Sequence, residues 1–238
     1  MFSHVGRTRT PAHNLKLASL LSFVAGSVNV AGFFSVHILT TNVTGHFAFF
    51  TEEVFLLNFP AAVHLALYVF AFFFGAFAAN FMVETLSRIR DSYTYVFPVL
   101  LEALILAVVG FYGAALKAAM PELIAATLLF AMGMQNSLVT SISRAIVRTT
   151  HLTGLFTDMG IEVSQLYFYK TTERRKKLLK SIKLRLTIIV MFFSGGICGA
   201  LLYTRVGIQA LYLGSILLLG GLLFDYIRIR LILKLRKR

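Results

Sequence analysis

The sequence has little charge, a single cysteine and no tryptophan. Only 14% of its 238 residues are charged and 58% are hydrophobic, whereas a typical soluble domain is about 25% charged. This balance excludes a soluble enzyme, a disordered tail and a nucleic-acid-binding domain, despite a formal net charge of +13. The lone cysteine, Cys198, excludes a disulfide within the chain. The composition therefore indicates a protein most of whose residues lie in a lipid bilayer.

Catalytic and cofactor motifs are absent as well. The sequence has no CxxC, HExxH, GxGxxG, P-loop or GxSxG pattern, and its six histidines lack the spacing of metal ligands. No apolar stretch carries a paired acid and base or a nucleophile beside a base. We therefore expect a protein that is not an enzyme and that holds no metal or cofactor.

Six apolar stretches are long enough to cross a bilayer, which takes about 20 residues of helix. Two further apolar segments, residues 45–58 and 154–169, are shorter. A helix of about 14 residues is only about 21 Å long, so both segments are predicted to be re-entrant half-helices. The predicted fold class is an all-α integral membrane protein with about six transmembrane helices. The predicted spans are residues 15–34, 60–83, 95–116, 121–142, 182–203 and 208–229.

The positive charges indicate how the spans are oriented. With six spans and both termini inside, 21 of the 23 Lys and Arg residues lie on the cytoplasmic side, and only Lys117 and Arg205 lie outside. Letting both short segments cross would place 18 inside and 5 outside, which fits the positive-inside rule less well. We therefore predict a multi-pass protein with a cytoplasmic N-terminal segment (residues 1–14) and a basic cytoplasmic tail (residues 233–238).

The chain contains an internal repeat. Residues 41–54 and 150–163 share six identical positions at a constant offset of 109. The first repeat, residues 15–116, and the second, residues 121–232, each comprise a span, a half-helix and two further spans. Because three spans is an odd number, the repeats are predicted to enter the membrane from opposite sides, as in many secondary transporters. The identical pairs are Thr41/Thr150, Thr44/Thr153, Gly45/Gly154, Phe47/Phe156, Glu53/Glu162 and Val54/Val163.

Three short motifs stand beside these repeated segments: Val43-Thr44-Gly45, Gly133-Met134-Gln135-Asn136 and Thr150-His151-Leu152-Thr153-Gly154. With them, the chain from about residue 15 to 232 resembles the YoaK family of small bacterial inner-membrane proteins, a domain of unknown function. The resemblance implies a six-span protein of the bacterial inner (plasma) membrane and a role in transport. It also implies aspartate where Asn29 stands and asparagine where His46 stands, so a proton or cation role is not carried over to those two positions.

The start of each half-helix is the predicted solute site. Thr44 and Thr153 are expected to cap the first turn, and the glycine that follows allows close approach of a ligand. Two helix N-termini facing each other at mid-membrane would favour an anionic or hydrogen-bonding solute. The alternative is that these residues only cap and pack two short helices. The predicted substrate-binding residues are Asn29, Thr41, Asn42, Thr44, Gly45, Gln135, Asn136, Thr150, His151, Thr153 and Gly154.

Polar residues within the apolar stretches provide further candidates. Asn29 and Asn136 need partners in lipid, and they either face the solute or hydrogen-bond to the backbone of the other repeat. Glu102 lies in the third span without an evident local partner, and Glu53 and Glu162 occupy equivalent places in the two half-helices. Ionisable residues within a membrane are functional candidates, so these three glutamates are candidate coupling residues.

The function predicted from the sequence is membrane transport, by a secondary transporter or a channel, of a small polar or anionic solute bound between the repeats. The rival is a non-transporting binding or regulatory subunit that acts through the basic cytoplasmic face. The expected partners are the lipid bilayer and the solute, with no nucleic acid. Gly195 and Gly199 form a small-residue face, which packs either within the chain or across a homodimer.

Overall fold

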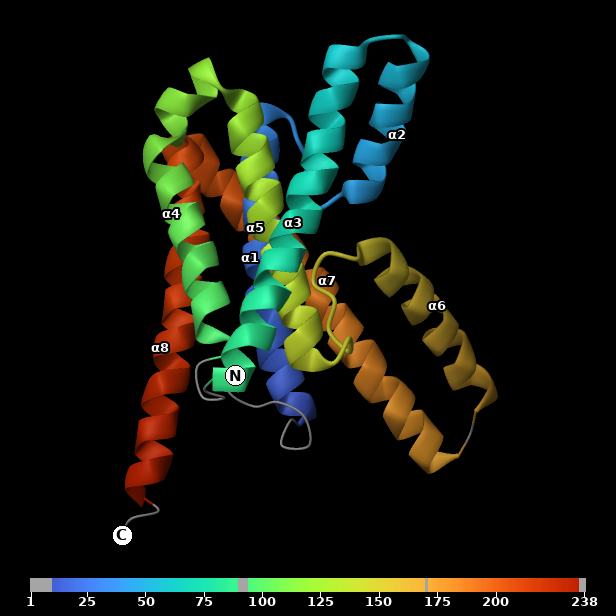
Figure 1. The fold of residues 1–238 in the computed structure, drawn as a ribbon. Helices are drawn as coiled ribbons and strands as arrows, with labels where there is room; N and C mark the ends of the chain where they lie inside the picture. Colours follow the sequence, from blue (N-terminus) through green and yellow to red (C-terminus); the bar gives the residue numbers. More distant parts are fainter. Residues whose placement is uncertain (1–9, 90–93, 170, 236–238) are drawn as a thin grey trace.

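The computed structural model describes residues 10–89, 94–169 and 171–235, and among them it contains helices and no strand (Figure 1). The predicted all-helical class is therefore confirmed for the described residues. In chain order the helices are α1 (Pro11–Val36), α2 (Val43–Phe55), α3 (Phe59–Ile89), α4 (Val96–Ala119), α5 (Pro121–Ser143), α6 (Leu152–Phe168), α7 (Thr172–Val206), the 3-10 helix η3 (Gly207–Ala210) and α8 (Leu211–Leu235).

Five helical stretches are long and apolar enough to cross a membrane. Four of them are α1, α3, α4 and α5, and the fifth is the 57-residue stretch Thr172–Arg228, which contains α7 and most of α8. A single straight helix of that length would measure about 85 Å, far more than one crossing needs. Figure 1 shows that α7 and α8 run in opposite directions. The six predicted spans thus lie on five stretches, the last of which holds two of them.

The terminal segments are described only in part. Residues 1–9 and 236–238 of the predicted cytoplasmic ends lie outside the described residues. Helix α1 begins at Pro11, four residues earlier than the predicted span, because Thr10 and His13 cap it reciprocally. Helix α8 continues to Leu235, into the predicted tail. The start of α1 and the end of α8 lie at the same end of the molecule (Figure 1).

The two predicted short helices are present as α2 and α6. Helix α2 has 13 residues and α6 has 17, which correspond to about 20 Å and 26 Å. Both begin two residues before the predicted start. Figure 1 shows that each begins halfway up the molecule: α2 rises beside the first half of α3, and α6 descends beside the first half of α7.

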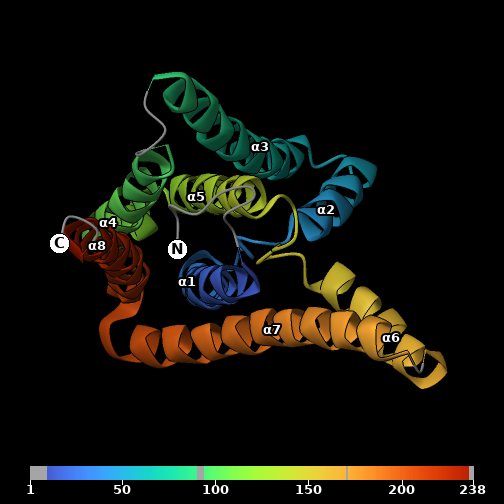
Figure 2. The same ribbon diagram turned by 90° about the horizontal axis from the view of Figure 1, so that it is seen from below.

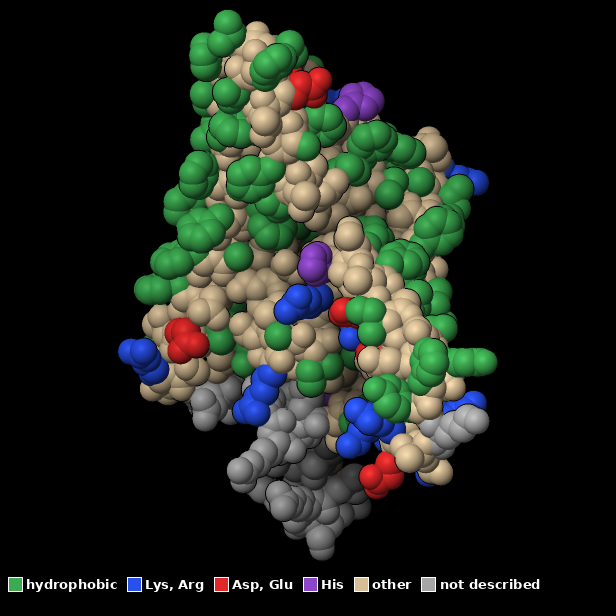
Figure 3. All heavy atoms as spheres, turned by 90° about the vertical axis from the view of Figure 1, so that its right-hand side faces the viewer, with side chains coloured by type: hydrophobic (Ala, Val, Ile, Leu, Met, Phe, Trp, Pro, Cys, Tyr) green, Lys and Arg blue, Asp and Glu red, His purple; other side chains and the backbone are tan. Residues whose placement is uncertain are grey.

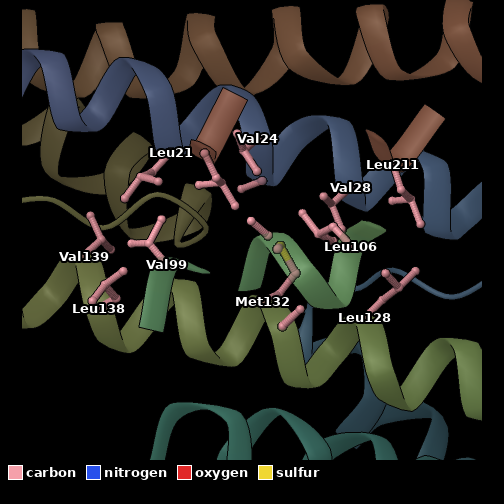
Figure 4. Packing of buried hydrophobic residues seen from close by; sticks show 14 of the residues in the cluster. Leu21, Val24, Val28, Val99, Leu106, Leu128, Met132, Leu138, Val139 and Leu211 are labelled. Carbon is pink, nitrogen blue, oxygen red and sulfur yellow. The ribbon is translucent and has the colours of Figure 1, made fainter. Parts of the chain in front are cut away.

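Helices α1 and α5 form the centre of the bundle. Seen from below (Figure 2), they lie side by side between α3 and α7, with α4 and α8 at one end and α2 and α6 at the other. In the most apolar windows of α1 and α5, 61% of residues are buried, compared with 17% in α3. The apolar side chains that meet there include Leu21 and Val24 of α1, Leu106 of α4 and Met132 of α5 (Figure 4). The central pair thus forms the protein core.

Along their apolar stretches, the outer helices expose large hydrophobic side chains. Phe73, Phe77 and Phe81 of α3 are each more than half exposed. A water-soluble monomer rarely exposes a large continuous apolar surface, whereas a bilayer accepts one. In Figure 3, hydrophobic side chains spread over the upper part of the face, and most Lys and Arg side chains in view lie in its lower half. This distribution is that of a membrane protein with one basic end.

Glycines allow α1 and α7 to cross at backbone contact. A Cβ on Gly26 would collide with the carbonyl oxygen of Phe192, and a Cβ on Gly195 would collide with the carbonyl oxygen of Phe23. Gly199 also faces α1, where a Cβ would lie 2.8 Å from the carbonyl oxygen of Ser27. The small-residue face of α7 is therefore used within the chain, which decides between the two packing alternatives that the sequence left open.

The crossing of α5 and α3 is built in the same way. A Cβ on Gly133 would collide with the carbonyl oxygen of Phe72, and a Cβ on Gly75 would collide with that of Phe130. These contacts correspond residue by residue to those between α1 and α7. Phe23 and Gly26 of α1 correspond to Phe130 and Gly133 of α5, 107 positions later, and Phe72 and Gly75 of α3 correspond to Phe192 and Gly195 of α7, 120 positions later. Two helix pairs far apart in the sequence therefore share one crossing geometry.

Candidate functional site

The two central asparagines fix the segments that lead into the short helices. Asn29 Oδ1 accepts hydrogen bonds from the backbone N–H of Thr41 at 3.2 Å and from its hydroxyl at 3.0 Å. Asn136 Oδ1 accepts from the hydroxyl of Thr150 at 3.2 Å. Each bond stays within one half of the chain. The asparagines thus tie the middle of α1 and of α5 to the chain just before α2 and α6, a contact within each half of the chain that the sequence analysis does not predict.

These ties lead to a prediction. The Thr150→Val variant is expected to weaken the start of α6 by about 1 kcal/mol, the usual net value of one hydrogen bond. Amide hydrogen exchange in the first turn of α6 should accelerate accordingly. Thr157→Val is the matched control, because Thr157 bonds only to the backbone carbonyl of Thr153 one turn earlier in α6. Equal exchange rates in both variants would contradict a positioning role for the Asn136–Thr150 bond.

The threonine caps predicted for the short helices are wrong. The backbone becomes helical at Val43 and Leu152, so the cap positions are Asn42 and His151, and Thr44 and Thr153 already lie inside the first turn. Asn42 Oδ1 accepts from the N–H of Gly45 at 3.0 Å. At the start of α6 no side chain caps the helix, which leaves first-turn N–H groups available to water or a solute.

His151 lies against Gly154 instead of capping the helix. A Cβ on Gly154 would lie 2.8 Å from Nδ1 of His151, and a Cβ on Gly45 would lie 2.6 Å from Nδ2 of Asn42. The glycine that follows the Thr-x-x-Thr pattern therefore makes room for the side chain at the cap position, not for a distant partner. This explains why both repeats have glycine there.

A pocket of about 430 Å³ opens at the start of α6. Its polar side chains come from the α5–α6 connection (Arg148 and His151), from α6 (Asp158) and from α7 (Ser181 and Arg185). Figure 3 shows basic, acidic and histidine side chains gathered at mid-height on this face. The apolar part of the lining is Ala145, Ile146, Leu155 and Leu184.

One guanidinium in this pocket faces two carboxylates. Arg185 Nε lies 3.0 Å from Glu162 Oε2, and Arg185 Nη1 lies 2.9 Å from Asp158 Oδ2. The hydroxyl of Ser181 donates to Glu162 Oε1 at 2.6 Å. The two arginines of the pocket, Arg148 and Arg185, are balanced in formal charge by Asp158 of the lining and by Glu162, which pairs with Arg185 but does not itself line the pocket. Such a site suits a small solute with both hydrogen-bond donors and anionic or other acceptor groups better than a simple anion.

The corresponding region of the first repeat is apolar. At the repeat offsets, Leu65 stands where Arg185 stands in the second repeat, and Phe49 stands where Asp158 stands. Glu53 of α2 corresponds to Glu162 of the second repeat, but its partner is not a cation. It accepts a hydrogen bond at 2.7 Å from the side chain of Asn58, which lies just after α2. His46 is buried, and its Nε2 lies 2.9 Å from the carbonyl oxygen of Leu39. The charged pocket is thus a feature of the second repeat.

Gln135 and Glu102 lie in the core, away from the pocket. Gln135 is fully buried, and its Nε2 donates to the carbonyl oxygen of Leu21 at 2.8 Å, which ties α5 to α1. Glu102 is fully buried in α4. The predicted substrate-binding residues therefore divide into four groups. His151 and Gly154 line the pocket, and Gln135 lies in the core. Four residues form the asparagine–threonine hydrogen bonds (Asn29, Thr41, Asn136 and Thr150), and four lie at the starts of the short helices (Asn42, Thr44, Gly45 and Thr153).

Sequence reasoning missed the role of Arg185. The sequence predicts it to be one of the basic residues that orient the chain, because eight Lys and Arg residues fall within positions 170–185. A usable signal was present: Asp158 and Glu162 are one helical turn apart on one face of α6, where a nearby cation relieves their mutual repulsion. Among the described residues, no group of three or more His, Cys, Asp or Glu side chains could hold a metal ion.

Comparison with known proteins places the chain in a family. Residues 17–224 match the family described as "Protein of unknown function (DUF1275)". The chain is also 28% identical over 202 residues to the UPF0700 transmembrane protein YoaK of Bacillus subtilis (strain 168), a match that covers 80% of this chain and 84% of that protein. No solved structure matches. The chain therefore belongs to the DUF1275 family of multi-pass membrane proteins, to which the resemblance to YoaK had pointed.

Proposed function

We propose that this protein transports a small polar or anionic solute across the bacterial inner membrane, with two inverted repeats surrounding the pathway. The observation that carries the proposal is the charge-balanced pocket at the start of α6, halfway along the molecule. Transporters commonly bind solutes near the midplane, where broken helices end. The uncapped first turn of α6 adds partly positive N–H groups to this site.

The inverted-repeat arrangement is supported by directions and by local contacts. In Figure 1, α1 and α5 run in opposite directions, and so do α2 and α6, α3 and α7, and α4 and α8. Both central helices end on a residue in the left-handed conformation, His37 with φ 58° and Arg144 with φ 54°, again 107 positions apart. The paired glycine crossings and the paired asparagine–threonine bonds follow the same correspondence.

In this proposal α2 and α6 are re-entrant, and both termini are cytoplasmic. The basic first turns of α7, with Arg174, Arg175, Lys176 and Lys177, then lie at the cytoplasmic surface, in contact with anionic lipid headgroups. The protein acts without enzymatic chemistry, its partners are the bilayer and the solute, and it binds no nucleic acid. A homodimer is compatible with this arrangement but does not need the glycines of α7, which pack against α1.

The experiment is a ligand screen followed by uptake into proteoliposomes. Purified protein in detergent is tested for thermal stabilisation by amino acids, organic acids, nucleobases and inorganic anions. A ligand at 100 times its dissociation constant stabilises the folded state by about 2.7 kcal/mol. A positive ligand should enter proteoliposomes that contain the protein.

The Arg148→Gln variant tests whether the ligand binds in the pocket at the start of α6. It is expected to lose at least tenfold in affinity, because a charged hydrogen-bond donor in the pocket is removed. The control is Arg175→Gln, an exposed cation on α7 outside the pocket, which should bind as the unmodified protein does. Binding without uptake, or uptake unaffected by Arg148→Gln, would count against the proposal. The first of these results would favour a non-transporting subunit.

A further inference from the structure

Glu102 is an acid without a partner in the core of the bundle. Its exposed fraction is 0%, and neither carboxyl oxygen has a hydrogen-bond partner among the described residues. It lies on the face of α4 formed by Val99, Ala103 and Leu106, all of which are buried in the apolar core. Figure 4 shows Val99 and Leu106 pointing toward α1 and α5 on either side of this level.

The helices around Glu102 offer no charge at its level. Ser215 of α8 donates to the carbonyl oxygen of Ala103, which fixes the level of α8, and Asp225 is ten residues beyond, about 15 Å along the helix. Lys16 of α1 places its Nζ 5.7 Å from the centre of the Phe224 ring. The other ionisable side chains of the described helices around α4 lie nearer the helix ends. They include His13 in α1, Glu122 in α5, His64, Glu84 and Arg88 in α3, and Tyr212, Tyr226, Arg228 and Arg230 in α8.

An ionised carboxylate in this place would be very costly. Moving a charge from water into an apolar interior without a partner costs many kcal/mol, and the group gives up its charge instead. In the conformation described here, Glu102 is therefore a neutral acid that carries a proton. A structural role does not explain it, because an unpaired buried polar group destabilises a fold by about 1–3 kcal/mol, and leucine would pack in its place.

We propose that Glu102 is a proton-binding site and that the structure is its proton-loaded state. The site releases its proton to water only when the contacts of α4 with α1, α5 and α8 open, and the carboxylate takes up another proton before they close. Each cycle breaks and remakes one O–H bond and leaves the protein unchanged. This inference rests on the proposed transport function, in which the proton is the coupling ion.

The first test needs no knowledge of the solute. Infrared spectroscopy of the protein in lipid at neutral pH is expected to show the carbonyl stretch of a protonated carboxyl group, absent in Glu102→Gln and present in Glu84→Gln, a control at an exposed glutamate. Transfer to D₂O should shift this band, because the site opens to solvent from time to time. Absence of the band, or a band that never shifts in D₂O, would overturn the proposal.

The second test uses transport. Glu102→Gln keeps the shape of the neutral acid, and Glu102→Leu removes the unpaired group, so both variants are expected to fold with a thermal midpoint equal to or above that of the unmodified protein. In proteoliposomes, a proton gradient should drive solute accumulation by the unmodified protein and not by either variant. Gradient-driven accumulation by Glu102→Gln would refute the proton site. Failure of all proteins to transport, with a shifting infrared band, would instead refute the transport function alone.

Discussion

The Gly26→Ala and Gly133→Ala variants are expected to destabilise the protein by about 1–3 kcal/mol each, the usual cost of overpacking a core. In both cases the new methyl group would collide with a backbone carbonyl of the facing helix, Phe192 for Gly26 and Phe72 for Gly133. A backbone carbonyl cannot change rotamer, so the two helices must separate. Because the crossings are equivalent, the two losses should be similar. Thermal unfolding in detergent measures both.

The Gly160→Ala variant is the matched control for these substitutions. Gly160 lies in α6, and a Cβ there would meet nothing within 4 Å. Alanine is a better helix former than glycine by about 1 kcal/mol, so this variant should be as stable as the unmodified protein or more so. If all three variants behave alike, the close crossings of α1 with α7 and of α3 with α5 do not exist as described.

The Glu162→Gln variant is expected to lower stability by about 1–3 kcal/mol, because it removes a charge-assisted, partly buried partner of Arg185. The Glu162 side chain is 14% exposed, whereas that of Asp158 is 52% exposed. An exposed ion pair contributes about 1 kcal/mol or less. Asp158→Asn should therefore have a clearly smaller effect, even though its oxygen is as close to Arg185 as that of Glu162. Thermal unfolding of the two variants tests this ranking.

A double-mutant cycle with Arg185→Met isolates the pair. If Glu162 and Arg185 hold α6 against α7, the double variant should be less destabilised than the sum of the two single variants, since neither charge is then left unpaired. Additive losses would indicate that the two side chains act independently. An effect of Asp158→Asn equal to that of Glu162→Gln would contradict the importance assigned to burial.

The parts of the fold that could be predicted from sequence depend on local pattern. Apolar length predicted the long helices, and the repeated Thr-x-x-Thr-Gly segments predicted two short helices whose starts were only two residues away from Val43 and Leu152. A repeated motif was visible in the sequence, since Gly26 and Gly133 each stand three residues before a central asparagine, Asn29 and Asn136. Its meaning was not, because nothing local indicates that each glycine faces a carbonyl on a helix more than fifty residues away.

The candidate site was only partly predictable for the same reason. The sequence points to polar residues near the short helices, but it predicts Thr44 and Thr153 as caps in place of Asn42 and His151, since a shift of two residues in a helix start changes which side chain reaches the free N–H groups. Arg185 does not stand out in the sequence, because its partners lie on another helix and seven other Lys and Arg residues fall between positions 170 and 183. Glu102 was found by the rule that an acid in a membrane span needs an explanation.

The arrangement of the two short helices is tested most directly by side-specific cysteine labelling. Cys198 is the natural cysteine, so Cys198→Ala provides a background for single cysteines at Asn58, after α2, and at Thr171, after α6. If both short helices are re-entrant, a membrane-impermeant thiol reagent labels position 58 only from outside the cell and position 171 only from the cytoplasmic side. Labelling of both positions from the same side would mean that α6 crosses the membrane and would contradict the inverted repeat.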